Sequence, residues 1–313
     1  LNGLRALSLL EACRRLGARY VPLNWRLAAP ELAAIADHAG LQQLLHDEAM
    51  AELAHAVRER VALPRLPAVD HLPGDVMLVY TSGTSGVPKG AIHTEAAMAA
   101  NVGAAIDAQG LDGATRTLAV LPLFHVGGLC IQVLPTLAAG GVVRLHARFD
   151  PGAWLRDVAD WRPTTSLLVP AVMRALIEHP DWARADLSSL AFVNSGSQIV
   201  PLPLIEAFHA RGVPVCQVYG STETGPVSVV LRPHEAMAHA GAAGRPAKGV
   251  ELRLADDGEV WMRGANLMRR YHASRDSGFD AAGWFHTGDL GRRGDDGLLH
   301  IVGRRSERII SGG

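Results

Sequence analysis

Helical and strand-like hydrophobic patterns alternate along the chain from residue 4 to about residue 230. Residues 4–16 repeat apolar side chains at helical spacing, and Gly17 follows them as a stop signal. Pro30 begins a second helical pattern, which Gly40 ends. Further helices are expected at 151–161, 170–178 and 202–210, and strands at 19–23, 76–80, 165–169, 190–193 and 215–218. This alternation is typical of doubly wound α/β units.

The pattern changes after about Gly241 to short alternating runs joined by turn dipeptides. Asp257-Gly258 separates residues 250–254 from 259–262, and Asp296-Gly297 precedes residues 298–302. We expect a small, mostly antiparallel β subdomain here.

Residues 117–143 carry no charge and are long enough to cross a bilayer. Pro122, Pro135 and two glycine pairs would interrupt a single helix repeatedly. We therefore expect a buried strand, a glycine loop, a helix and another strand, and no integral membrane segment.

Composition narrows the class of protein further. The formal net charge is -1 over 313 residues, so no basic surface for nucleic acid is expected. Hydrophobic residues at 48% and charged residues at 19% are typical of a globular interior. Cys13, Cys130 and Cys216 are far apart and form no CxxC, which favours reduced thiols and a cytoplasmic location.

The strongest local signal follows the expected strand 76–80. The segment reads Thr81-Ser82-Gly83-Thr84-Ser85-Gly86-Val87-Pro88-Lys89-Gly90. Hydroxyls, glycines and a lysine after a strand favour phosphate binding, although Pro88 and Gly90 depart from a Walker A loop. A solvated Gly/Ser hairpin is the alternative interpretation.

Residues 81–90 resemble the phosphate loop of the acyl-adenylate-forming, or AMP-binding, superfamily. Four more family motifs follow in order: LPLFH at 121–125 (acid pocket), YGSTE at 219–223 (adenine and metal), GWFHTGD at 283–289 (ribose) and GRRSE at 303–307 (hinge). The resemblance implies a layered αβαβα core of two doubly wound subdomains with a smaller antiparallel β subdomain, and the mobile C-terminal domain absent. The expected parts are 1–112 with the phosphate loop, 113–240 with the acid pocket and adenine motif, 241–302 as the β subdomain, and 303–313 as a truncated hinge.

The resemblance also implies a role for each site residue. The Tyr219 ring would stack on adenine, the Thr222 hydroxyl would reach the α-phosphate, and the Glu223 carboxylate would hold Mg²⁺. Asp289, expected in a turn, would accept hydrogen bonds from the ribose hydroxyls, and Arg304 would contact the ribose and phosphate side. The alternatives from the residues alone are a core tyrosine, a solvated carboxylate, a turn-capping aspartate and a surface arginine.

The implied site has two sets of residues. Catalytic roles fall to Lys89, Thr222, Glu223 and His125, with Glu223 as the metal ligand. Nucleotide binding falls to Thr81, Ser82, Gly83, Thr84, Ser85, Gly86, Lys89, Ser197, Gln198, Val218, Tyr219, Gly220, Thr222, Asp289 and Arg304.

His125 would border the acid pocket and the thiol tunnel, as in the CoA-ligase branches; a core histidine is the alternative. It carries no negative charge for a substrate ammonium, which disfavours an α-amino acid. Ser197 and Gln198 stand where relatives usually carry a Gly-Gly-Ala-like stretch. His234 and His239 miss the HExxH spacing by one residue, so no zinc helix is expected.

The implied reaction joins a fatty or aryl acid to CoA through an acyl-adenylate, with ATP and Mg²⁺, releasing pyrophosphate. One alternative is an adenylating module that loads a carrier-protein pantetheine; another is a non-catalytic nucleotide-binding descendant. Residues 219–227 resemble plant coumarate–CoA ligases, whereas 304–313 resemble bacterial acyl- and succinylbenzoate-CoA ligases. Because the family's adenylation lysine follows the hinge motif, we expect the 313-residue chain to bind ATP and acyl-adenylate but to turn over slowly.

Overall fold

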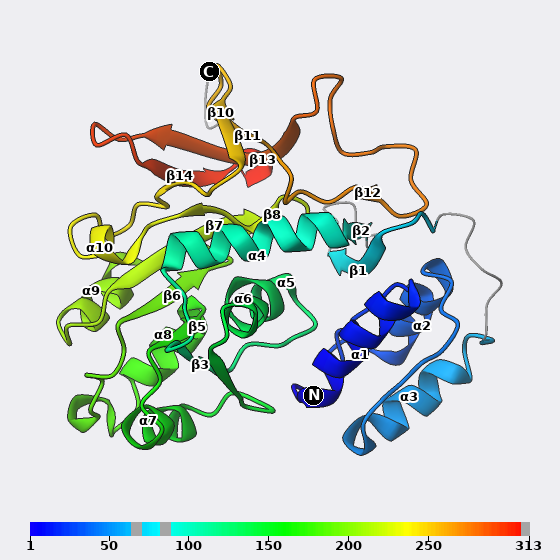
Figure 1. Cartoon of the computed structure of the whole chain (residues 1–313), viewed down its shortest axis with the longest axis horizontal. Coiled ribbons are helices and arrows are strands. Elements are labelled where there is room, and N and C mark those ends of the chain that lie inside the picture. Colours follow the sequence, from blue (N-terminus) through cyan, green and yellow to red (C-terminus); the bar gives the residue numbers. More distant parts are fainter. Residues whose placement is uncertain (64–70, 82–88, 308–313) are drawn as a thin grey trace.

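The computed structural model describes residues 1–63, 71–81 and 89–307. The described residues form three sheets with helices packed around them (Figure 1). The helices are α1 (Leu4–Leu16), α2 (Ala29–His38), α3 (Ala51–Arg58), α4 (Glu95–Gln109), α5 (Val126–Gly128), α6 (Leu134–Ala138), α7 (Pro151–Asp160), α8 (Pro170–Ile177), α9 (Leu202–His209) and α10 (Pro233–Ala236). A π-helical turn, Leu129–Val133, joins α5 to α6, and short 3₁₀ turns lie at Glu48–Met50, Trp182–Arg184 and Arg305–Glu307.

The large sheet has the strand order β4-β3-β5-β6-β7-β8-β9. Its strands are β3 (Arg116–Ala119), β4 (Val142–Leu145), β5 (Thr165–Leu168), β6 (Phe192–Gly196), β7 (Val215–Ser221), β8 (Gly225–Val230) and β9 (Arg245–Pro246). Strands β3 to β7 run parallel, and β8 and β9 add antiparallel strands at one edge. The chain is therefore a mixed α/β fold with a parallel sheet, as the alternating pattern predicts.

Side chains from successive strand residues enter cores on opposite faces of this sheet. Leu168 of β5 packs in a core with α7, α8 and α9, which includes Trp154 and Phe208. The preceding residue, Leu167, packs in a second core with α4 residues such as Ala104. Helices thus cover both faces (Figure 1), which explains the continuous apolar runs of the central strands.

Two smaller sheets lie beside the large one. The first has the order β1 (Asp75–Thr81), β2 (Lys89–Thr94) and β12 (Arg270–Tyr271), all antiparallel. The second has the order β10 (Val250–Leu254), β11 (Glu259–Gly264), β13 (Phe285–Arg293) and β14 (Leu299–Arg304). This separate antiparallel sheet confirms the prediction made for the region after Gly241. It lies along the top of the molecule in Figure 1, across from α1 to α3.

Local sequence signals explain where the helices begin and end. Gly17 takes φ +64° after α1, and Gly110 takes φ +65° after α4, as helix-ending glycines do. The Thr94 hydroxyl accepts from the Ala97 amide at 3.0 Å and caps α4. Asp150 caps α7 in the same way, accepting from the Ala153 amide at 2.6 Å.

The expected strand at 19–23 is wrong. Only Tyr20 pairs there: its amide donates to Val76 O at 2.8 Å, and its carbonyl accepts from the Leu78 amide at 2.9 Å. Pro22 lacks an amide hydrogen and cannot continue such a ladder.

Three further findings bear on the sequence predictions. Among the described residues, no helix combines the length and apolar character needed to cross a membrane. Residues 117–143 instead form β3, the α5–α6 region and β4. The two strands and the helix are as predicted, but the predicted glycine loop is wrong, because Gly127 and Gly128 lie in α5. Cys13, Cys130 and Cys216 are free thiols.

Candidate functional site

The candidate site is built at the carboxyl ends of β6 and β7, where parallel α/β sheets bind ligands. Gly196 ends β6, and a Cβ atom on it would lie 2.2 Å from Val218 O. Ser197 follows with φ +69° and is exposed, as is Gln198. The close contact between Gly196 and the Val218 carbonyl thus places Ser197 and Gln198 beside β7. These are the two residues that differ from the family pattern.

Strand β7 runs to Ser221, three residues beyond the end predicted for the strand at 215–218. The register shifts between Tyr219 and Ser221 opposite β8. A Cβ atom on Gly220 would lie 2.4 Å from Gly225 O, which requires glycine there. With this register shift, residues 219–221 remain in the sheet, and the turn that follows them lies at its edge.

The turn between β7 and β8 carries Thr222 and Glu223. The Ser221 hydroxyl accepts from the Glu223 and Thr224 amides, both at 3.2 Å, and the Ser221 amide donates to Thr224 Oγ1 at 2.9 Å. These bonds fix the backbone locally. The side chains of Thr222 and Glu223 remain half-buried at the edge of the sheet.

A buried histidine supports this turn from the other side. His93 of β2 is 3% exposed, and its ring hydrogen-bonds to the backbone of Thr222. Its Nε2 atom has no partner among the described residues. Burial lowers the pKa of His93 to about 4, with the bond to Thr222 acting in the opposite direction. The ring is therefore neutral near pH 7.

Tyr219, Asp289 and Arg304 form one connected cluster. The Tyr219 hydroxyl donates to Asp289 Oδ2 at 2.8 Å, and Arg304 Nε donates to Asp289 Oδ1 at 2.9 Å. Burial, with the Asp289 carboxylate beside it, raises the pKa of the Tyr219 hydroxyl. Residues from three sequence-predicted motifs, 219–223, 283–289 and 303–307, are thus brought together.

Asp289 lies in strand β13 and not in a turn, which corrects the sequence expectation. Gly288 takes φ +71°, and its amide donates to Glu259 Oε1 at 2.9 Å. The register between β11 and β13 shifts at this point. The Asp289 amide also donates to Thr287 Oγ1 at 3.1 Å, so a bulge aims the carboxylate at Tyr219.

Lys89 and Glu223 meet through a residue that no motif indicated. Lys89 Nζ lies 5.0 Å from the ring centroid of Tyr271, and the Tyr271 hydroxyl donates to Glu223 Oε1 at 3.1 Å. Burial and the Glu223 carboxylate raise the pKa of this hydroxyl. Tyr271 and His93 were missed because their contacts join distant segments; the sequence carries no local signal for either.

The predicted phosphate loop is described only at its two ends. Thr81 pairs with Lys89 across the β1–β2 ladder, and the Thr81 hydroxyl donates to Lys89 O at 3.4 Å. Ser82, Gly83, Thr84, Ser85 and Gly86 lie outside the described residues. The ladder holds the loop's first and last residues opposite each other.

His125 is the N-cap residue of α5 and is solvent-accessible, so the core-histidine alternative is wrong. Surrounding protein atoms, and then the Arg26 charge, lower its pKa. The Phe124 and His125 ring centroids lie 4.5 Å apart. A Cβ atom on Gly127 would lie 3.9 Å from Ser197 Oγ, so this loop faces the end of β6.

No cluster of three or more potential metal-ligating side chains occurs in ranges 1–63, 71–81 and 89–307. A metal ion beside Glu223 would therefore have this one carboxylate as its acidic protein ligand. Within those ranges the Tyr271 hydroxyl donates to Glu223 Oε1, and no hydrogen bond is found to Oε2. A single carboxylate fits Mg²⁺ that is otherwise held by nucleotide phosphates and water.

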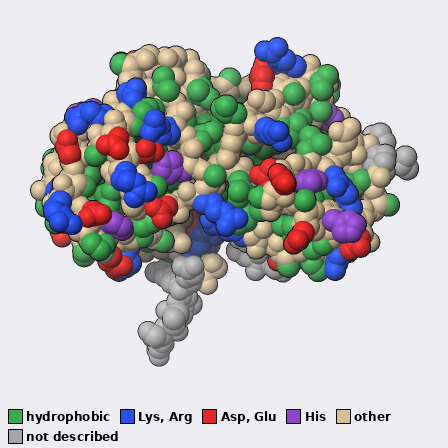
Figure 2. Space-filling model, turned by 90° about the horizontal axis from the view of Figure 1, so that it is seen from below, with side chains coloured by type: hydrophobic (Ala, Val, Ile, Leu, Met, Phe, Trp, Pro, Cys, Tyr) green, Lys and Arg blue, Asp and Glu red, His purple; other side chains and the backbone are tan. Residues whose placement is uncertain are grey.

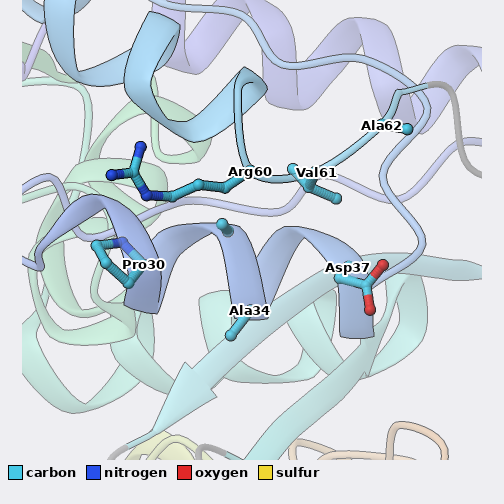
Figure 3. Close-up of a pocket in the computed structure, with 7 residues that line it drawn as sticks. Pro30, Ala34, Asp37, Arg60, Val61 and Ala62 are labelled. Carbon is cyan, nitrogen blue, oxygen red and sulfur yellow. The ribbon is translucent and has the colours of Figure 1, made fainter.

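A hollow among the described residues lies away from the candidate site. Acidic and basic side chains are interspersed over most of the face in Figure 2. The hollow in Figure 3 lies between α2 and the segment after α3. Its lining residues are Pro30, Ala33, Ala34, Asp37, Arg60, Val61 and Ala62, and none is a predicted site residue.

Sequence comparison assigns this chain to a known family. The AMP-binding enzyme family matches residues 1–272. Indoleacetate–CoA ligase of Aromatoleum aromaticum is 40% identical, with alignment over 100% of this chain and 69% of the relative. Feruloyl-CoA synthase of an Amycolatopsis species is 37% identical, over 98% and 67%. The chain belongs to the AMP-binding enzyme family, and these relatives are acid–CoA ligases.

Solved structures agree with this assignment. The N-terminal domain of FACL13 from Mycobacterium tuberculosis superposes with a TM-score of 0.86 and 26% identity, covering 97% of this chain and 84% of that chain. O-succinylbenzoate coenzyme A synthetase of Bacillus subtilis, in complex with ATP and magnesium ion, superposes with a TM-score of 0.84 and 30% identity, over 99% and 69%. The chain thus superposes on the N-terminal domain of FACL13 and spans about two thirds of the length of the B. subtilis synthetase.

Proposed function

We propose that this chain is the adenylating portion of an ATP-dependent carboxylic acid–CoA ligase. The observation that carries the proposal is a pair of side-chain clusters, whose members come from three sheets and from the turn after β7. Lys89 and Glu223 meet at Tyr271, and Tyr219 and Arg304 meet at Asp289. The first cluster offers a cation and a carboxylate for phosphates, and the second offers an aromatic ring and a carboxylate for a nucleoside.

The proposed nucleotide site divides along β7. Val218, Tyr219 and Gly220, with Ser197 and Gln198 from the end of β6, line the adenine side. Asp289 accepts from the ribose hydroxyls while keeping its bonds to Tyr219 and Arg304, because each carboxylate oxygen has more than one lone pair. Thr81 and the loop through Gly86 bind the phosphates, together with Lys89.

In the first half-reaction, a substrate carboxylate oxygen attacks the α-phosphorus of ATP and pyrophosphate leaves. Negative charge builds on the phosphate oxygens, and the Thr222 hydroxyl and the Lys89 ammonium would stabilise it. A unit charge pair at ~4 Å is worth about 4 kcal/mol at an effective dielectric of 20. Glu223 would hold Mg²⁺, which neutralises phosphate charge when bound.

In the second half-reaction, the CoA thiol releases its proton to solvent and its sulfur attacks the acyl carbonyl carbon. The bond from that carbon to the phosphate oxygen then breaks, and AMP leaves. His125 borders the path of both acid and thiol. The indoleacetate and feruloyl relatives favour an aryl acid over a fatty acid. We further propose the parts 1–112, 113–240, 241–302 and 303–313 as the working units of this cycle; cytoplasmic location remains a prediction.

Binding is tested first with a non-hydrolysable acyl-adenylate mimic. At 100 times its dissociation constant the mimic should stabilise the fold by about 2.7 kcal/mol in thermal unfolding. Lys89→Ala and Asp289→Ala should weaken that response, because each removes a charged contact. Glu251→Gln, in an exposed ion pair with Arg263, is the control. A full response in both site variants would remove these residues from the site.

Activity is tested by acid-dependent pyrophosphate exchange. Aryl and fatty acids are compared, with CoA or a carrier-protein pantetheine as acceptor. The proposal expects exchange with an aryl acid and thioester formation on CoA, slow in this chain and faster when the segment following the hinge in relatives is joined to it. Transfer only to the carrier would favour a loading module. Nucleotide binding without acid-dependent exchange would favour a non-catalytic descendant.

A further inference from the structure

Residues 266–272, here termed the strap, tie the phosphate-loop strand to the turn that carries Glu223. The Met268 amide donates to Glu223 O at 2.8 Å. The Arg269 amide then donates to Ile92 O at 2.8 Å, and the His272 amide to Gly90 O at 2.7 Å, both on β2. A segment more than 40 residues after the turn thus fixes its position relative to Lys89.

Tyr271 is the strap residue that reaches both functional side chains. Its hydroxyl donates to Glu223 Oε1 at 3.1 Å, and Lys89 Nζ lies 5.0 Å from its ring centroid. These contacts use different parts of one side chain, the hydroxyl and the ring face. A phenylalanine keeps the second contact and loses the first, which makes the two separable by mutation.

The ring itself is held firmly. Tyr271 is 8% exposed and packs in one core with Met268 and Phe285. Gly278 takes φ +87°, and a Cβ atom on it would lie 3.2 Å from Tyr271 Cε2. Backbone pairing of Tyr271 with Ala91 adds a further constraint. The Tyr271 hydroxyl is therefore presented to Glu223 from a fixed point.

A hydrogen bond to one oxygen of a carboxylate restricts its rotation and directs the other oxygen. Removing a group that hydrogen-bonds to a metal ligand commonly lowers metal affinity by 10- to 100-fold. A cation over an aromatic face is likewise restricted without losing its charge. One buried ring can thus orient two groups of opposite charge. It thereby reduces the conformational entropy that these two side chains lose when the nucleotide binds.

We propose that Tyr271 is a positioning residue that orients the Glu223 carboxylate through its hydroxyl and the Lys89 ammonium through its ring face. The inference rests on the proposed function, because it assigns Glu223 to Mg²⁺ and Lys89 to phosphate. It adds a residue outside the five sequence motifs to the working site.

The test measures the dissociation constant of a non-hydrolysable ATP analogue by calorimetry, with Mg²⁺ and with EDTA. Tyr271→Phe should leave the value in EDTA unchanged and reduce the strengthening by Mg²⁺ about 10-fold. Tyr271→Leu should also weaken binding in EDTA, because Lys89 loses the ring. Tyr20→Phe, another largely buried tyrosine, is the control and should match the wild type. Thermal unfolding without ligand checks that each variant is folded.

The outcomes separate the inference from the proposed function. No analogue binding by the wild type would overturn the proposed function, and the inference with it. Mg²⁺-dependent wild-type binding with an unchanged ratio in Tyr271→Phe would overturn the inference alone. Equal weakening of Tyr271→Phe with and without Mg²⁺ would also overturn it, because a merely structural role predicts that result. Glu223→Gln combined with Tyr271→Phe should be no worse than Glu223→Gln alone.

Discussion

At the scale of single residues, the site depends on buried polar groups that support half-buried functional ones. His93 holds the backbone of Thr222, and Tyr271 holds the side chain of Glu223. The sequence predicted the half-buried partners, Thr222 and Glu223, because a known motif contains them. It did not predict the supporting pair, because their roles depend on which strands lie side by side.

The buried His93 ring predicts acid sensitivity of the fold. Its pKa falls to about 4, below the unfolded value of 6.5, so between these values the unfolded state binds a proton that the native state does not. Stability present above pH 6.5 is therefore lost as pH falls, by about 2 kcal/mol at pH 5. His93→Gln should flatten this part of the curve in urea denaturation at pH 7, 6 and 5, whereas His55→Gln, at an exposed position, should not. Parallel curves for the wild type and His93→Gln would contradict the assignment.

At the scale of elements, the sequence predicted most helices and the parallel strands because prolines, glycines and apolar periods coincide there. Helix α8 is a clear case, with Pro170 at its start and its predicted end one residue from the observed one. The failure at 19–23 arose because an apolar run reads as a strand even where proline prevents pairing. Strand β12 was unpredictable for a different reason, since its two residues pair with β2 about 180 positions earlier in the chain.

Two helical glycines should respond oppositely to alanine. A Cβ atom on Gly128 of α5 would lie 2.2 Å from Pro122 O, a backbone atom of the acid-pocket loop. Gly103 of α4 has nothing within 4 Å of the same position. Gly128→Ala should destabilise the fold by about 3 kcal/mol through overpacking, and Gly103→Ala should stabilise it by about 1 kcal/mol through helix propensity. Urea denaturation checks both, and similar midpoints for the two variants would refute the close-contact explanation.

At the scale of the whole molecule, the candidate site joins sheets that the sequence placed in different parts. Tyr219 comes from the large sheet, whereas Asp289 and Arg304 come from the small antiparallel sheet. Backbone bonds between the sheets are few near this point; the Ala243 amide donates to Leu299 O at 2.7 Å. A ligand held by both sheets should therefore act as an additional connection between them.

Ligand binding should protect the small sheet as strongly as the large one. At 100 times its dissociation constant, an acyl-adenylate mimic adds about 2.7 kcal/mol to any opening that breaks the site. Amides of β13 and β14 that exchange through separation of the sheets should then slow about 100-fold in hydrogen exchange. Amides of α3, which packs in a different core, serve as the internal control. Protection of β7 without protection of β13 and β14 would mean that the ligand contacts the large sheet only. If the Asp289 carboxylate connects the ligand to the small sheet, Asp289→Asn should lose the protection of β13 and β14 and keep that of β7.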